Sequence, residues 1–90
     1  MELILVTADG NVEIVEYLLD NGAEINIKSD DNTTPLIIAS CYDHLETVEL
    51  LVKRSADINS KDDDGNTALS NAKEYGNEEV TIFLREQGAE

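Results

Sequence analysis

The sequence predicts an all-α solenoid, in which short antiparallel helix pairs stack on one another and β-hairpin or turn fingers project from the stack. Three observations indicate this fold class. Residues of one type recur thirty-three positions apart, short apolar segments have helical spacing, and polar segments containing Asp, Asn and Gly separate them. With 4% aromatic residues and no Trp, the 90-residue chain also has few of the large side chains on which a compact globule of this size depends.

The thirty-three-residue period covers nearly the whole chain. Alanine recurs at Ala23, Ala56 and Ala89. The same spacing separates Leu18, Leu51 and Leu84, Glu13, Glu46 and Glu79, Asn26 and Asn59, Thr34 and Thr67, Leu36 and Leu69, Ala39 and Ala72, and Tyr42 and Tyr75. We therefore expect a single domain over residues 1–90 with no linker, divided into repeats at approximately 1–28, 29–61 and 62–90.

The segment Thr34–Ala39, "TPLIIA", predicts the start of the first helix of the middle repeat. Its threonine can accept a hydrogen bond from a free backbone N–H, and its proline has no N–H to leave unpaired. Leu36, Ile38 and Ala39 then supply a short apolar face. We expect this helix to end near Tyr42.

A turn separates this helix from the second one. The turn position is Gly10, Asp43 or Gly76 in the three repeats, and a helix C-terminus often needs the left-handed geometry that these residues tolerate. The second helix is expected from about Leu45 to Lys53. Apolar residues recur along it at helical spacing, at Leu45, Val48, Leu51 and Val52, while Glu46 and Glu49 face solvent.

Ser55 follows the second helix of the middle repeat, where Gly22 and Gly88 stand in the others. If the backbone is left-handed there, Ser costs on the order of 1 kcal/mol relative to Gly. The polar segment from about residue 58 to 66 then predicts a projecting finger. Asn32 and Gly65 occupy the same place in the two fingers, and both tolerate positive φ.

The period and three sequence blocks together resemble the ankyrin repeat. The blocks are Thr34–Ala39 for the TPLHxA helix start, Asp43–Glu46 for the Gly-His turn, and Ala56–Asn59 for the GADVN loop. Ile37 and Ser70 stand where the family has the histidine of its helix start, which ties adjacent repeats by hydrogen bonds. We therefore expect this chain to depend more on apolar packing.

The two end repeats depart from the middle one. The helix that starts at Thr67 lacks the proline and carries Asn71 opposite Ile38, so we expect it to be the least stable. At the other end, Leu3, Ile4, Leu5 and Val6 follow one another, and such a helix is expected to expose apolar surface. We expect about two and a half to three repeats, cut from a longer array or covered at this end by a second subunit.

Three short motifs are better explained without a ligand. The segment Ser60–Asn66 has the Gly of an EF-hand loop but neither its first acidic ligand nor the glutamate at position twelve. Cys41 and His44 have no third orienting group, and they are too few to hold a metal. The sequon at Asn32 has no secretion signal beside it. We expect no catalytic site, cofactor or metal, and thus no enzyme.

The charge and the cysteine content restrict partners and location. The formal net charge of −14 repels phosphate backbones and anionic lipids, so we expect neither nucleic acid nor membrane as a partner. One cysteine cannot form an intramolecular disulfide. We expect the cytoplasm as its location, with the nucleus left open.

The resemblance implies a partner-binding concave surface, made by the finger tips and the exposed side of the first helices. Carboxylates would steer a basic partner, and tyrosines would anchor it. The candidate residues at the matching positions are Asp9, Asp30, Asp31, Thr33, Cys41, Tyr42, Asp63, Asp64, Asn66, Glu74 and Tyr75, with Ala8 beside Asp9. The alternatives are a solvated surface without ligand, or a self-assembling scaffold unit joined through Leu3, Ile4, Leu5 and Val6.

Overall fold

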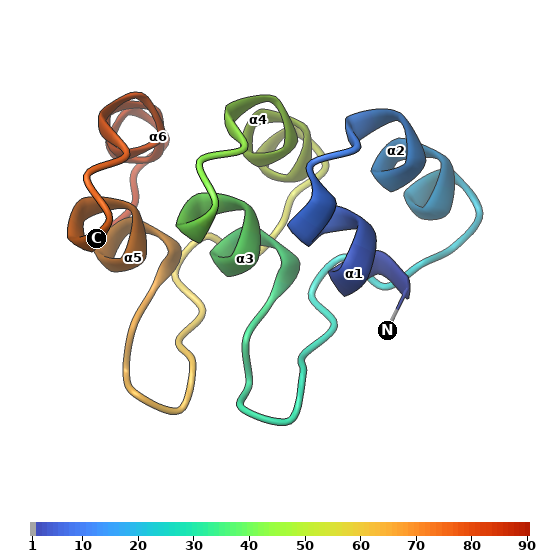
Figure 1. Ribbon diagram of the computed structural model, residues 1–90, viewed down its shortest axis with the longest axis horizontal. Coiled ribbons are helices and arrows are strands. Elements are labelled where there is room, and N and C mark those ends of the chain that lie inside the picture. Colours follow the sequence, from blue (N-terminus) through green and yellow to red (C-terminus); the bar gives the residue numbers. More distant parts are fainter. Residues whose placement is uncertain (1) are drawn as a thin grey trace.

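A computed structural model describes residues 2–90, and within this range the chain forms six helices in three antiparallel pairs (Figure 1). The pairs are α1 (Glu2–Asp9) with α2 (Val12–Asp20), α3 (Pro35–Cys41) with α4 (Leu45–Lys53), and α5 (Ala68–Glu74) with α6 (Glu78–Glu86). Helices α1, α3 and α5 form one layer, and α2, α4 and α6 form the other (Figure 1). The predicted all-α stack of helix pairs is confirmed.

The fingers are turns rather than β-hairpins, since residues 2–90 contain no strand. In the first finger, Ser29 N donates to Thr33 O at 3.0 Å and Asn32 N donates to Ser29 O at 2.9 Å. These two bonds close the loop, and no strand continues from it within residues 2–90. Both fingers extend from the side of α3 and α5 that faces away from the second layer (Figure 1).

The starts of α3 and α5 follow the expected capping chemistry. Thr34 Oγ1 accepts from Ile37 N at 3.3 Å, with Pro35 at the first helical position. In the third pair, Thr67 Oγ1 accepts from Ser70 N at 3.2 Å and Ser70 Oγ accepts from Thr67 N at 2.9 Å. Ser70, in the position of the missing histidine, thus completes a capping box. The lower stability expected for α5 stays a prediction.

The expected left-handed positions are confirmed. The non-glycine residues with positive φ are Asn32 (65°), Asp43 (61°) and Ser55 (71°) within residues 2–90. Glycines with positive φ occupy the same places in the other repeats. They are Gly10, Gly22, Gly65, Gly76 and Gly88.

The core lies between the two layers and continues from pair to pair. Leu36, Val48, Leu51 and Leu84 are buried, and the small Ala39 and Ala72 are fully buried where the helices of the first layer meet. The first helix exposes apolar surface at Leu5 as expected, but two of the four residues named for a self-contact are not available for it. Leu3 and Ile4 are buried in this core, so they cannot form a surface contact, and of the four apolar residues only Leu5 is largely exposed.

Polar contacts between pairs are more numerous than expected, which corrects the expectation of mainly apolar stacking. His44 Nε2 donates to Ala8 O at 2.9 Å. One repeat later, Asn77 Nδ2 donates to Ser40 O at 2.8 Å and to Cys41 O at 3.2 Å.

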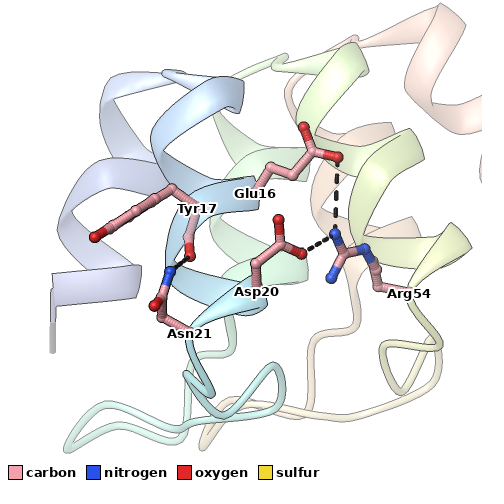
Figure 2. A network of polar contacts seen from close by, with 5 residues as sticks. All are labelled: Glu16, Tyr17, Asp20, Asn21 and Arg54. Atoms are coloured by element: carbon pink, nitrogen blue, oxygen red, sulfur yellow. Dashed lines mark hydrogen bonds and ion pairs between the residues drawn. The ribbon is translucent and has the colours of Figure 1, made fainter.

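Side chains of the loops and of the second layer add further contacts. Asn26 Oδ1 accepts from Asp57 N at 2.8 Å, and Asn59 Oδ1 accepts from Glu90 N at 3.1 Å. In the second layer, Arg54 pairs with Asp20 and lies 3.7 Å from Glu16 on α2 (Figure 2). The sequence departs from the family histidine, but other residues tie the repeats together.

Candidate functional site

A shallow hollow of about 360 Å³ lies between the first finger and the helices of the first layer. Four elements supply its lining: α1, the first finger, α3, and the C-terminal end of α5. The lining residues are Ile4, Ser29, Asp31, Thr33, Ile38, Cys41, Tyr42 and Tyr75. We call this hollow the concave groove. Five of the predicted site residues line it.

Helix geometry places the two tyrosines at the groove. Tyr42 and Tyr75 are the C-caps of α3 and α5, thirty-three residues apart, so the stacking of the pairs puts them at the same level of neighbouring repeats. Both are largely exposed. The ring of Tyr42 meets the ring of His44 edge to face, with centroids 6.1 Å apart. Exposed tyrosine rings of this kind suit anchoring of a partner, since each offers an apolar face and a hydroxyl.

The first finger fixes the position of the Asp31 carboxylate. It accepts hydrogen bonds from Ser29 Oγ and, at 3.3 Å, from Thr33 N. The Ser29 bond first, and Thr33 second, lower the pKa of Asp31 below its ordinary value. Asp31 therefore presents a negative charge at the mouth of the groove over the whole physiological pH range.

The thiol of Cys41 is partly buried, and two carboxylates lie near enough to act on it. Partial burial raises the pKa of Cys41, and the carboxylates of Asp62 and Glu74 raise it further. Asp62 lies on the second finger, and Glu74 is the last residue of α5. A cationic group from a partner would be stabilised there by the same carboxylates.

The remaining predicted residues lie outside the lining of the groove. Asp9, Asp30, Asp64 and Glu74 are exposed. The Asp63 carboxylate accepts from Asn32 Nδ2 at 2.7 Å, and Asn66 Oδ1 accepts from Ser70 Oγ at 3.2 Å. Asp63 and Asn66 thus have structural contacts that a partner would have to share.

Contacts between the two fingers hold the tips at a fixed distance from each other. Besides the Asn32–Asp63 bond, Asp63 N donates to Asp31 O at 2.9 Å. Asp62 Oδ1 accepts from the backbone N–H groups of Asp64 and Asn66, both at 2.9 Å, and so closes the second finger. The two fingers are therefore one connected acidic edge rather than two independent loops.

Sequence reasoning missed three residues of the lining: Ile4, Ser29 and Ile38. Ser29 had a usable signal, because a serine hydroxyl in a turn commonly bonds to the backbone a few residues on, as Ser29 Oγ does in accepting from Thr33 N at 3.2 Å. Ile38 had a weaker one, the polar Asn71 at the equivalent position. Nothing in the sequence separates Ile4 from its apolar neighbours.

The groove is suited to binding rather than to a reaction. The ring of His44 donates to the Ala8 carbonyl and so serves the stack. The thiol of Cys41 is kept protonated, which makes it a poor nucleophile.

Over residues 2–90, no helix has the length and apolar character needed to cross a membrane.

The sequence matches a known protein family. A family model described as "Ankyrin repeats (3 copies)" matches residues 3–90. No curated protein sequence matches the chain.

Proposed function

Because the chain belongs to the ankyrin-repeat family, we propose that it binds a basic segment of another protein through the concave groove and the acidic finger tips. Members of the family are generally protein–protein interaction modules and are typically non-catalytic. The observation that carries the finer proposal is the meeting of Asp31, Tyr42 and Tyr75 at one groove.

The geometry supports a Lys- or Arg-bearing partner in particular. Asp31 is held ionised at the groove, and the carboxylates of Asp62 and Glu74 act on Cys41 in its lining. A cation over the face of a tyrosine ring adds about 0.5–1 kcal/mol at an exposed site. The net charge of −14 would also steer a basic partner toward the chain, whereas nucleic acid and anionic lipid would be repelled.

We infer a location in the cytoplasm or the nucleus, because a single unpaired cysteine stays reduced in these compartments.

The test is selection of a random displayed peptide library on the chain, followed by binding kinetics of an enriched peptide. We expect enriched sequences to contain Lys or Arg. Asp31→Lys combined with Asp64→Lys should slow association by about tenfold or more at low ionic strength.

The control is Glu46→Lys combined with Glu49→Lys, which changes the net charge equally on the solvent side of α4. If both double variants slow association to the same extent, only the overall charge matters. If neither slows it, the acidic tips have no part in binding.

The second candidate, a scaffold unit joined through α1 alone, has less support. Leu3 and Ile4 are buried, and Val6 is partly buried, so Leu5 would be the main contact. One leucine gives a small interface.

A further inference from the structure

The first helix pair exposes residues whose equivalents are covered in the other two pairs. Ile14 is 41% exposed, whereas Thr47 and Val80, one and two repeats later, are 1% and 0% exposed. Leu18 is only partly buried, whereas Leu51 and Leu84 are fully buried. In the second and third pairs, the preceding pair covers these positions.

Two larger side chains belong to the same surface. Tyr17 is 64% exposed and points away from Arg54 and α4 in Figure 2, while its equivalents Leu50 and Phe83 pack against the core. Leu5 is 66% exposed, and its equivalent Asn71 is buried. We call the surface formed by Leu5, Asn11, Ile14, Tyr17 and Leu18 the N-face.

The N-face also carries an asparagine at the position that makes polar contacts between the second and third pairs. Asn11 stands at the position of Asn77, whose amide donates to the Ser40 and Cys41 carbonyls at the end of the preceding inner helix. A surface that fits the N-face should therefore offer two carbonyls at a helix end. In this chain, Lys73 and Glu74 at the end of α5 occupy that position.

The opposite end of the stack has a hollow of about 410 Å³, which we call the C-face. Its lining residues are Lys73, Gly76, Glu78, Thr81, Ile82 and Arg85. Thr81 has nearly the shape of the buried Val48, its equivalent, and its hydroxyl already donates to Asn77 O at 2.9 Å. Covering Thr81 would therefore leave no polar group unpaired.

The two ends carry complementary charges. On the C-face, Lys73 and Arg85 outnumber the one acidic residue of the lining, Glu78, in a chain with only six basic residues. Glu2 and Glu24 line a hollow of the first pair together with Leu18. A contact between the two ends brings these opposite charges to one interface, whereas contact of the N-face with itself would bring carboxylates together.

We propose that the N-face of one copy docks on the C-face of a second copy, so that the internal stacking continues from molecule to molecule. The packing uses the positions that already join α2 to α4 and α4 to α6. Because each copy keeps one unused face, the contact is heterologous, and it produces open-ended stacks rather than a closed dimer. The concave groove stays accessible along the stack.

Sedimentation velocity over a range of concentrations tests this proposal. At about 0.15 M ionic strength, where a Debye length of about 8 Å screens the repulsion between copies of net charge −14, the average mass should rise with concentration beyond that of a dimer. Tyr17→Glu blocks the N-face and Arg85→Glu blocks the C-face. Each variant alone should associate roughly tenfold or more weakly than the unchanged chain.

Mixing the two variants separates this arrangement from the others. Each retains one intact face, so an equimolar mixture should form a one-to-one dimer and nothing larger. Tyr75→Glu, at an equally exposed tyrosine of the concave groove, is the control and should associate as the unchanged chain does. A monomer at all concentrations, a mixture that stays monomeric, or an Arg85→Glu variant that dimerises alone would each overturn the proposal.

Discussion

The ring of His44 donates from Nε2 to the carbonyl oxygen of Ala8 at 2.9 Å and thereby joins the second helix pair to the first. The same ring lies over Gly10, where an added Cβ would come 2.7 Å from its Cε1 and Nδ1 atoms. The glycine is thus needed for two reasons, its φ of 78° and the space that the ring occupies.

Gly10→Ala should therefore destabilise the fold more than Gly76→Ala. Both residues have positive φ, so each alanine costs about 1–2 kcal/mol in backbone strain. Only Gly10 also displaces a ring, since nothing lies within 4 Å of the Cβ position at Gly76. We expect an extra loss of about 1–3 kcal/mol for Gly10→Ala in urea unfolding. If Gly10→Ala and Gly76→Ala lost the same stability, the His44 ring would have to move aside at no cost in free energy.

Ser55→Gly should stabilise the protein. Ser55 holds a φ of 71°, which costs a residue with a Cβ on the order of 1 kcal/mol. We expect the melting temperature to rise by about 4–8 °C. Gly22→Ser is the matched reverse change, at the equivalent position with open space around it, and should lower the melting temperature by a similar amount. Unchanged melting temperatures for both variants would contradict the strain argument.

Thr47→Val should also stabilise the protein. The Thr47 hydroxyl is buried and has no hydrogen-bond partner within the described part of the chain. Its equivalents are Ile14 and Val80, so the position accepts an apolar side chain of this shape. We expect a gain of about 1 kcal/mol in the free energy of unfolding.

The control for this change is Thr81→Val, which removes a hydroxyl that donates to Asn77 O. It should be neutral or destabilising by up to about 1 kcal/mol. A loss of stability for Thr47→Val would mean that its hydroxyl has a partner after all.

Cys41 should react slowly with iodoacetamide in the folded protein. The thiolate is the nucleophile, and burial together with Asp62 and Glu74 raises the pKa of Cys41. We expect alkylation to reach half its maximal rate at a higher pH in the folded chain than in urea. Glu74→Gln should lower that pH only in part, because burial is the larger cause.

The same shift has a consequence for stability. The unfolded chain releases the Cys41 proton at a lower pH than the folded chain does. The contribution of this group is therefore complete below the pKa of the unfolded thiol and is lost as the pH rises through the raised pKa of the folded one. An alkylation profile that is the same with and without urea would contradict the shift.

Much of the candidate site could be anticipated, because it repeats with the fold. The tyrosines and the acidic fingers stand at equivalent positions of successive repeats, and Cys41 is the neighbour of one of the tyrosines. The engagement of Asp63 by Asn32 could not be anticipated, since it depends on the distance between two fingers. The roles of Ser29 and Ile4 in the groove depend in the same way on how the first pair meets the second.

The sequence alone determined the period, the helix bounds of the middle repeat and the left-handed positions. Each of these depends on contacts within a few residues, such as a threonine cap or a residue that tolerates positive φ. The stacking decided the burial of Leu3 and Ile4, the use of Asn77 in place of a histidine, and the exposure of Tyr17. Those outcomes depend on residues about one repeat apart in the chain, which only the packing of one helix pair on the next brings together.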